Sequence, residues 1–496
     1  MSTPDAIVVG AGPNGLAAAV TLARAGLAVE LFERNSTVGG GARTAETTVP
    51  GFRHDLGSAV HPMALASPFF RAFGIERRVA FVVPEVSYAH PLGSGDGHGA
   101  GGRGEARAGL AWRDLDRAVD ELGRDGGAWR RLFAPLVRES GALLDIVGDT
   151  LLRVPRHPLT LARFGLRSIE QGGPAWNLRF RDETAPAMLT GLAAHAAGRM
   201  PHPVRAGAGL LLGALAHARG WPIPVGGSQA ISDALAVDFV AHGGRIHLDV
   251  EVADVRELPA ARVLLLDVAA PIAARIAAGR LPEASRRRLE RMRFGAGVFR
   301  LDLAVNAPIP WSDERIGRAG TVHLGGTRPQ LAEAERRTSG PNGVLPPHPF
   351  VLLSQPTLFD PSRAPAGKHT VWAYTHVPAG SSIDAEQAIL ATVEAAAPGF
   401  RDTIIASASR TATQLEMENP SLIGGDISGG LIDLRQTVFR PRARHPWRIG
   451  DGVFLASSSA APGPGVNGLA GWRAALDALS LEFDAPAPEL GPESRS

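Results

Sequence analysis

Three glycines near the start of the chain have the spacing of a phosphate-binding turn. The segment AIVVGAGPNG joins a short apolar run to an alanine-rich stretch, and its glycines follow the pattern G-x-G-x-x-G. Gly10 permits a tight strand-to-helix turn, Gly12 lets a pyrophosphate approach the backbone, and Gly15 lets the helix lie close to the sheet. A helix that begins here presents free N–H groups and a partial positive charge to phosphates.

An acidic residue completes this motif. Glu33 follows the last of these glycines by eighteen positions, where a second apolar segment, Ala28–Phe32, ends. Its carboxylate can accept hydrogen bonds from both hydroxyls of a ribose, as in dinucleotide-binding β-α-β units. We therefore predict a strand at Ile7–Val9, a helix at Leu16–Ala25 and a second strand at Ala28–Phe32. An ordinary glycine-rich turn is the alternative interpretation.

A second glycine-rich segment favours FAD over a nicotinamide cofactor. Residues 34–44 read RNSTVGGGART and include Gly40, Gly41 and Arg43. Paired glycines let the backbone pass beside a pyrophosphate, and an arginine can neutralise its charge. A nicotinamide dehydrogenase has no need of this second element, and the alternative is a surface loop with a solvated arginine. Further predicted FAD contacts are Pro13, Asn14, Arg34 and Ser58.

Composition limits the other kinds of chemistry. The chain has 496 residues, enough for two or three domains, and 45% hydrophobic and 20% charged residues are typical of a globular protein. A formal net charge of +2 does not indicate a nucleic-acid partner. The absence of cysteine excludes thiolate metal sites, Cys-x-x-Cys redox pairs and attachment of a flavin through cysteine. We predict no metal site.

The apolar stretches are short for a membrane span. Ala206–Ala218, the most apolar later stretch, has about thirteen residues, whereas a spanning helix needs about twenty. We therefore expect a cytoplasmic protein. Residues 151–181 carry six arginines against the single acid Glu170, interleaved with leucine and phenylalanine. This pattern is typical of a solvated helical face, and peripheral docking on anionic lipid, from which a lipophilic substrate could enter, is the alternative.

Breaks and periodicities along the chain predict an α/β protein. We expect a discontinuous, Rossmann-like FAD-binding domain and an inserted α+β substrate-binding domain. Residues 245–252 alternate as a strand does, 263–266 form a buried apolar run, and segments between 298 and 377 alternate as in an antiparallel sheet. The predicted parts are FAD-binding 1–75, helical substrate-binding 76–223, FAD-binding 224–295, substrate-binding sheet 296–420, FAD-binding 421–482 and a tail at 483–496.

Taken in order, these segments resemble the phytoene-desaturase-like branch of the FAD-dependent amine oxidase superfamily, which includes carotenoid oxidoreductases and retinol saturases. The resemblance covers nearly the whole chain and includes the two N-terminal signatures, Pro224–Ser228, Val252 and the C-terminal segment Ser457–Gly468. It implies that the backbone of Val252 contacts the adenine end of FAD. It also implies that the pyrimidine side of the flavin lies beside Gly465, Val466 and Asn467.

The chain departs from this family at two positions. Asn467 stands where the family often has histidine, and Ala461 stands where it often has a polar residue. The C-terminal glycines formally repeat G-x-G-x-x-G, but no further strand and acid follow them, so we expect one dinucleotide only. Oxygen or a quinone is therefore the expected electron acceptor. Lys368, in an apparent hairpin turn, does not fit the flavin-side lysine of amine oxidases.

Candidate catalytic residues are few. His61 follows the Asp55-x-Gly57 turn expected near the flavin ring, and its alternative role is a structural hydrogen bond. Asp426 faces the substrate by family analogy. His195 and His217 lie in alanine-rich helices, where a buried, satisfied histidine is the expected interpretation.

These features predict FAD-dependent dehydrogenation of a hydrophobic polyene or isoprenoid substrate, by hydride transfer from carbon to flavin N5. A redox-neutral isomerase or saturase is an alternative that keeps the flavin. Oxidation of an amine or a natural-product intermediate is another. The last alternative is a flavin-binding protein without turnover.

Overall fold

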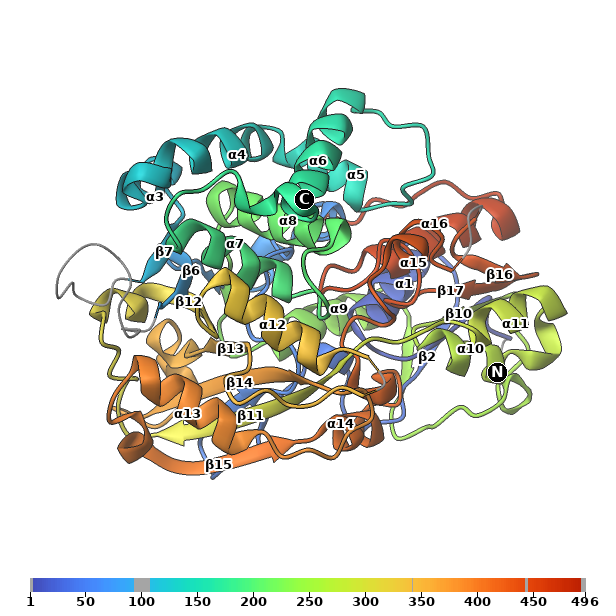
Figure 1. Cartoon of the computed structure of the whole chain (residues 1–496). Helices are drawn as coiled ribbons and strands as arrows, with labels where there is room; N and C mark the ends of the chain where they lie inside the picture. Colours follow the sequence, from blue (N-terminus) through green and yellow to red (C-terminus); the bar gives the residue numbers. More distant parts are fainter. Residues whose placement is uncertain (1–2, 93–107, 341, 442–444, 492–496) are drawn as a thin grey trace, which may run out of the picture.

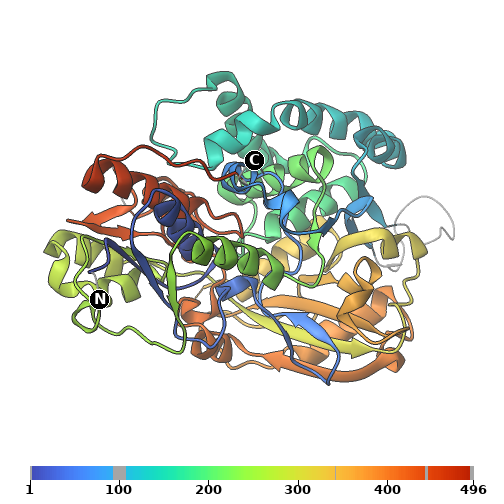
Figure 2. The ribbon, with the colours of Figure 1, turned by 180° about the vertical axis from the view of Figure 1, so that it is seen from behind.

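The computed structural model describes residues 3–92, 108–340, 342–441 and 445–491. Two large sheets lie side by side, and a layer of helices covers them (Figure 1). In this view the first sheet is on the right, the second is at the lower left, and helices α3 to α8 are at the top. The view from behind shows the same three parts (Figure 2).

The first sheet is built from strands far apart in the sequence. Its order is β16-β17-β10-β1-β2-β9, and all neighbours are parallel except β16 and β17. Helices α1, α9 and α16 pack together beside it. The strands are β1 Ala6–Val9, β2 Val29–Phe32, β9 Arg245–His247, β10 Val263–Leu266, β16 Arg448–Gly450 and β17 Val453–Leu455. The helices are α1 Pro13–Arg24, α9 Gln229–Ala241, α10 Ala270–Ile276, α11 Glu283–Glu290 and α16 Leu469–Ala478.

The first β-α-β unit follows its sequence signals closely. Strand β1 is buried along its whole length, and α1 begins at Pro13, where a proline costs no hydrogen bond because the first helical N–H groups are unpaired anyway. Gly26, with a φ of +85°, follows the C-cap of the helix. The helix therefore starts three residues before the predicted Leu16.

The second sheet is mostly antiparallel, and one of its faces forms a wall of a cavity. Its order is β15-β11-β14-β13-β12-β6-β7, and only β6 and β12 run parallel. Helix α13 packs on one face through Ile389 and Val393, and the opposite face turns toward the helical layer. The strands are β6 Val86–His90, β7 Gly109–Trp112, β11 Gly297–Val305, β12 Ala319–Leu324, β13 Val351–Ser354, β14 His369–Val377 and β15 Ile404–Arg410.

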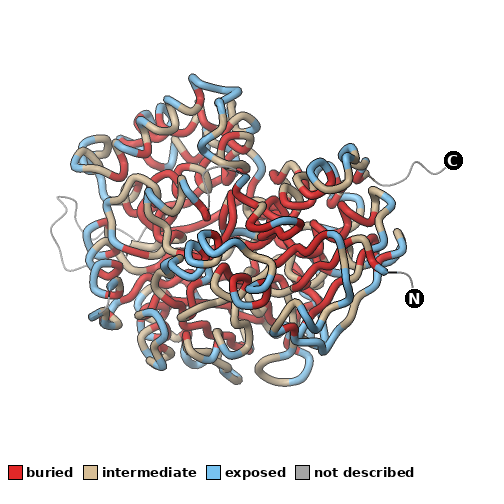
Figure 3. Tube along the Cα trace, turned by 90° about the vertical axis from the view of Figure 1, so that its right-hand side faces the viewer, coloured by how far each residue is buried: buried red, intermediate tan, exposed pale blue. Residues whose placement is uncertain are grey.

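The helical layer packs against this sheet through α7 and α8. Figure 3 shows the buried chain concentrated in the middle of the molecule, with exposed turns around it. The helices are α3 Leu115–Glu121, α4 Gly126–Arg138, α5 Ser140–Val147, α6 Pro158–Gln171, α7 Thr184–Ala194 and α8 Pro203–Ala218. The remaining elements are α2 Pro68–Phe73, α12 Arg328–Thr338, α13 Glu386–Ala396, α14 Ala412–Glu418, α15 Leu434–Val438, β3 Thr44–Glu46, β4 Arg53–Asp55, β5 Phe81–Val82 and β8 Ile223–Pro224.

Two sequence-based expectations about strands need correction. The strand predicted at 245–252 ends at His247, because Asp249 has a φ of +58° and the chain turns there. Leu248 and Val250, whose alternation suggested the strand, are exposed. The segment predicted as helical, 76–223, also supplies β6 and β7 to the second sheet. The other predicted domain boundaries stay predictions, and residues 492–496 of the predicted tail lie outside the described part.

Candidate functional site

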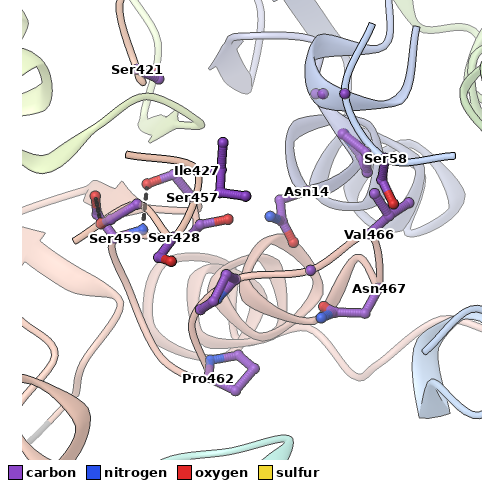
Figure 4. Close-up of a pocket in the computed structure, with 18 of the residues that line it drawn as sticks. Asn14, Ser58, Ser421, Ile427, Ser428, Ser457, Ser459, Pro462, Val466 and Asn467 are labelled. Atoms are coloured by element: carbon purple, nitrogen blue, oxygen red, sulfur yellow. Dashed lines mark hydrogen bonds between the residues drawn. The ribbon is translucent and has the colours of Figure 1, made fainter. Parts of the chain in front are cut away.

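A cavity of about 910 Å³ runs between the two sheets and the helical layer. The glycine-rich segments after β1 and β2, the loops after β10 and β17, and residues 427–429 line one part of it. The face of the second sheet and helices α6 and α8 line the rest. Figure 4 shows the side chains of Asn14, Ser58, Ser428, Ser457, Val466 and Asn467 around the first part. This cavity therefore joins the predicted cofactor residues to an apolar chamber.

The first glycine turn leaves no room for a side chain at Gly15. A Cβ atom at Gly15 would lie 2.0 Å from the carbonyl oxygen of Gly10, so only glycine lets α1 approach the turn. Gly10 has a φ of +98°, which favours glycine. Gly10, Gly12, Pro13 and Asn14 line the cavity, whereas Gly15 lies behind them.

Glu33 lies at the carboxyl end of β2 with its carboxylate buried. Oε2 accepts from Ala11 N–H at 2.8 Å, and Oε1 accepts from the backbone N–H and side-chain amide of Asn35 at 2.9 and 2.6 Å. Each carboxylate oxygen has two lone pairs, so Oε2 keeps acceptor capacity for a ribose hydroxyl. The residue lines the cavity, as predicted from its position.

The second glycine segment contacts the first. A Cβ atom at Gly40 would lie 2.9 Å from Gly12 Cα, so the two turns meet backbone to backbone. Arg43 Nε donates to Gly40 O at 3.2 Å, and burial lowers the pKa of the Arg43 guanidinium. Arg34, Gly41 and Ser58 line the same region. The arrangement places a positive charge beside two glycine turns, which suits a pyrophosphate.

Asp267 is a site residue that the sequence analysis missed. It directly follows β10, and its Oδ2 accepts from Gly15 N–H at 2.8 Å, at the N-terminus of α1. Burial and, less strongly, the charge of Glu33 raise the pKa of Asp267 to about 7. Ligands of parallel sheets bind at the carboxyl ends of neighbouring strands, and β10 lies next to β1. The end of the apolar run at Leu266 was the signal that could have revealed it.

The C-terminal segment after β17 forms the opposite wall. Asn467 is held by its own loop and by the start of α2, because its Oδ1 accepts from Leu469 N–H at 2.9 Å and its carbonyl accepts from Ser67 Oγ at 2.6 Å. Gly465 and Val466 line the cavity beside it. The buried Oδ1 of Asn14 has no hydrogen-bond partner among the described residues. A polar group in the cavity could satisfy this oxygen.

Val252, predicted at the adenine end, lines the cavity next to the first sheet. The chain turns toward Glu33 after β9, since Val250 N–H donates to the Glu33 carbonyl at 2.9 Å. Residues 250–252 and Glu33 therefore border the same part of the cavity.

Asp426 holds a loop. Its Oδ2 accepts from Gly295 N–H at 2.6 Å, its Oδ1 accepts from Ser428 N–H at 2.6 Å, and the residue is not among those that line the cavity. Arg440 also holds this loop, by donating to the carbonyl of Ser428 at 2.7 Å, and burial lowers the pKa of Arg440 to about 10. The catalytic role predicted for Asp426 therefore finds no support in its geometry.

His61 lines the cavity and has one free ring nitrogen. Ser228 Oγ donates its single hydrogen to the carbonyl of Ser58, so the 2.7 Å contact between His61 Nε2 and Ser228 Oγ requires His61 to donate. His61 Nδ1 is then an acceptor, and it is buried without a partner among the described residues. Burial lowers the pKa of His61 to about 4, so the ring is neutral near pH 7.

A buried ion pair between Asp55 and Arg363 is linked to His61 through Ser228. Asp55 Oδ1 accepts from Ser228 N–H at 2.8 Å and from Thr44 Oγ1 at 2.7 Å, while its Oδ2 pairs with Arg363 at 2.7 Å. Both partners of the ion pair are almost fully buried. His61 is thus connected to the second glycine segment through Ser228 and Asp55.

The second part of the cavity is mainly apolar. Val298, Leu352, Trp372 and Tyr374 project from the second sheet, and Leu211 and Leu212 are among the lining residues of α8. His195 also lines this part, which corrects its interpretation as a satisfied core histidine. His217 has the expected structural role, since it accepts from Trp129 Nε1 at 3.1 Å and lies away from the cavity.

The residues at the first part of the cavity fit FAD. The N-terminus of α1, the guanidinium of Arg43 and the acceptor of Glu33 match a pyrophosphate and a ribose. The glycines of the two turns carry no side chain that would keep a pyrophosphate away from the backbone. Asn14 Oδ1 and His61 Nδ1 have no partner among the described residues, so polar groups of FAD could hydrogen-bond to them. In the part of the chain that the structure describes, no group of three metal-ligating side chains could hold a metal ion.

The chain is similar to known proteins in sequence and in fold. Residues 8–73 match the family described as an NAD(P)-binding Rossmann-like domain. Over 95% of its length the chain is 27% identical to pyridine nucleotide-disulfide oxidoreductase domain-containing protein 2 of Rattus norvegicus, of which it covers 92%. A shorter match, 44% identical over 79 residues, covers 16% of the chain and 16% of a carotenoid 3,4-desaturase of Haloarcula japonica.

Solved structures share the fold over almost the whole chain. An oxidoreductase from Methanosarcina mazei has a TM-score of 0.61 at 18% identity and covers 94% of this chain and 98% of its own. Cyclohexylamine oxidase from Brevibacterium oxydans has a TM-score of 0.58 at 16% identity, covering 97% and 99%. These likenesses show the fold, an α/β architecture with a Rossmann-like dinucleotide-binding domain, and the predicted fold class is confirmed. The predictions of an oxidoreductase and of FAD agree with them and are part of the proposed function.

Proposed function

We propose that the protein dehydrogenates a hydrophobic polyene or isoprenoid substrate with FAD as the oxidant. The observation that carries this proposal is the continuity of one cavity, which joins the two glycine turns to a chamber walled by α6, α8 and the second sheet. The short similarity to a carotenoid 3,4-desaturase agrees with an apolar substrate. Membership of the phytoene-desaturase-like branch is part of the proposal.

Bound FAD supplies a hydride acceptor, the flavin N5. Glu33 would accept hydrogen bonds from the ribose of FAD, and Arg43 with the N-terminus of α1 would balance the pyrophosphate charge. We propose that residues Gly465 to Asn467 lie beside the pyrimidine side of the flavin. The apolar walls exclude water and orient the substrate carbon that loses the hydride.

His61 is an acid–base group among the residues that line the cavity. His61 is neutral and presents an unpartnered Nδ1, so it can accept a hydrogen bond or a proton there. Loss of the hydride to FAD would leave a positive charge that conjugation within the substrate stabilises, and loss of a proton from the neighbouring carbon, with His61 Nδ1 as the proposed acceptor, would complete the double bond. Oxygen or a quinone is the proposed final electron acceptor.

The exposed surface around α6 suggests how a lipophilic substrate enters. Leu159, Leu166 and Ile169 on α6 are 79%, 69% and 61% exposed, while Leu161 and Phe164 of the same helix line the cavity. Ile169 is exposed on the surface and also lines the cavity. One helix thus connects an exposed apolar surface to the chamber, and we propose that this surface docks on a membrane.

Charge contributes less to this docking surface than the sequence suggests. Arg153 pairs with Asp149 at 2.8 Å, Arg163 pairs with Glu139, and Arg179 pairs with Glu170. The apolar side chains therefore supply most of the proposed affinity. No helix in the described ranges is long and apolar enough to cross a membrane. The predicted cytoplasmic location stays a prediction.

Liposome co-sedimentation tests the docking surface. Leu159→Ser with Leu166→Ser should release the protein from anionic vesicles, whereas Val237→Ser, at an equally exposed apolar residue of α9, should not. Charge reversal at Arg156 and Arg163 should have a smaller effect. Binding that survives the paired leucine substitutions would exclude docking through α6.

Anaerobic bleaching of the flavin tests the reaction. Protein loaded with FAD is mixed without oxygen with a panel of polyenes, isoprenoids and small amines, and the loss of the visible flavin absorbance is followed. Bleaching by polyenes or isoprenoids supports the proposal. Bleaching by amines with peroxide release in air would indicate the amine oxidase alternative, and turnover only with pre-reduced flavin would indicate an isomerase or saturase.

A further inference from the structure

His195 is the polar residue at which α7 ends, and it faces the apolar part of the cavity. It follows Ala194 as the C-cap of the helix and is only partly covered by other residues. Its Nε2 lies 2.8 Å from Nε2 of His323 on β12. One ring must donate and the other accept, so Nδ1 is the nitrogen that His195 can offer to a molecule in the cavity.

His195 contacts His323 on β12, which forms a buried pair of histidines with His90 on β6. The parallel register of β6 and β12 pairs Tyr88 with Thr321, which places His90 next to His323 on the same face of the sheet. His90 Nε2 donates to the carbonyl of Gly326 at 2.8 Å, so its Nδ1 is an acceptor. The Nδ1 atoms of His90 and His323 are both buried without a partner among the described residues.

A glycine makes room for this cluster. A Cβ atom at Gly191 on α7 would lie 2.9 Å from His323 Nδ1 and 3.0 Å from His90 Nδ1. The backbone of α7 therefore lies directly over both rings, which fixes His195 at the end of the same helix. Trp221 meets the His195 ring edge to face at a centroid distance of 5.6 Å.

Burial keeps these rings neutral. Burial, with a smaller contribution from the charge of His376, lowers the pKa of His195 to about 3. Burial also lowers the pKa of His323 well below its ordinary value. Polar groups placed in an apolar chamber cost free energy unless they are hydrogen-bonded, so a ligand that satisfies them is favoured over one that does not.

We propose that His195 hydrogen-bonds a hydroxyl or carbonyl oxygen on an otherwise apolar substrate. This inference rests on the proposed function and narrows its substrate class, from polyenes or isoprenoids in general to those that carry an oxygen. A neutral imidazole serves both groups, since Nδ1 accepts from a hydroxyl in one tautomer and donates to a carbonyl in the other. His323 is a positioning residue that holds the ring.

Matched ligand pairs test this assignment. An acyclic polyene hydrocarbon, its monohydroxylated form and its keto form are compared for dissociation constant and for anaerobic flavin bleaching by the FAD-loaded protein. The wild type should bind an oxygenated form about tenfold more tightly, as expected for one hydrogen bond of about 1.4 kcal/mol. His195→Phe should remove this preference and leave hydrocarbon affinity within about twofold.

Two further variants separate recognition from stability. His195→Gln keeps a hydrogen-bonding side chain and should restore part of the preference. His217→Phe removes a buried histidine away from the cavity, so it should lower the melting temperature and keep the preference. Equal affinity for both members of each pair in the wild type, or a preference that survives in His195→Phe, would overturn the inference.

The outcomes also separate this inference from the proposed function. Binding with the expected preference but without any flavin bleaching would contradict dehydrogenation and still support His195 as the recognition residue. Bleaching by hydrocarbons and oxygenated forms alike would support dehydrogenation and overturn the role of His195. Failure to bind any member of any pair would overturn both.

Discussion

Replacing Asp267 by asparagine should make the protein more stable, and increasingly so as the pH rises. The carboxyl of Asp267 faces the N-terminus of α1, and burial raises its pKa from 3.8 to about 7. The folded state therefore holds the proton more tightly than the unfolded state does. Stability is unaffected below about pH 4, falls as the pH rises from about 4 to about 7, and stays at its lower value above that.

The size of the effect follows from this pKa difference. About 1.4 kcal/mol for each pH unit between 3.8 and about 7 gives a cost of about 4 kcal/mol for burying the charged carboxylate. Because the cavity side of Asp267 is open to solvent, this figure is an upper limit. Between about pH 5 and about pH 8 the advantage of Asp267→Asn should then grow by as much as roughly 3 kcal/mol.

Thermal unfolding of the FAD-free protein measures this. The gap in melting temperature between Asp267→Asn and wild type should widen between about pH 5 and about pH 8. The amide oxygen can still accept from Gly15 N–H, so the hydrogen bond itself is kept. Asp120→Asn, on the exposed face of α3, controls for the loss of one charge. A gap for Asp267→Asn that is the same at every pH would refute the reasoning.

Three more substitutions test other parts of the site. Gly15→Ala places a methyl group 2.0 Å from a backbone oxygen and should abolish FAD retention, whereas Gly141→Ala, with open space around its Cβ, should leave the flavin content of the purified protein unchanged. Arg363→Leu leaves the Asp55 carboxylate buried without its cation and should cost about 3–5 kcal/mol in urea unfolding; a loss below about 1 kcal/mol would contradict the burial argument. His61→Phe should keep FAD but slow anaerobic bleaching roughly 10²-fold, and an unchanged rate would remove His61 from the chemistry.

The cofactor half of the site could be predicted because its signals are local. Gly10, Gly12 and Gly15 meet a steric requirement that any sequence must meet with glycine at such a turn, and Glu33 ends the next strand of the same unit. Helix α1 and strands β1 and β2 therefore formed close to where the periodicity placed them. Local motifs of this kind need no knowledge of distant pairing.

The substrate half depends on contacts between distant segments. His195 and His323 are separated by 128 positions and meet only because β12 pairs with β6 in parallel. Asp267 enters the site because β10 lies beside β1; the apolar run that ends at Leu266 marks the end of a strand, but not which strand it pairs with. Asp426 shows a limit of the family resemblance, by which it was expected to face the substrate: its carboxylate accepts from the backbone N–H groups of Ser428, in its own loop, and of Gly295.

Alternation alone was misleading at β9. Residues 245–252 alternate like a half-buried strand, but Leu248 and Val250 are exposed and Asp249 turns the chain out of the sheet. The turn brings Val250 into a hydrogen bond with the Glu33 backbone. This contact directs the segment that includes Val252 along the cavity. The turn at Asp249, which ends the strand early, therefore helps to form the site.

We propose that one FAD lies in the cavity between the two glycine turns and the C-terminal segment. Titration of flavin-free protein with FAD, followed by the change in flavin fluorescence, tests it most directly. We predict saturation at one FAD per chain for the wild type and no saturable binding for Glu33→Ala, which also loses the acceptor of Ala11 N–H and Asn35 N–H and should melt at a lower temperature. Protein that is purified colourless and takes up no FAD, or a Glu33→Ala variant that binds FAD as the wild type does, would contradict the account.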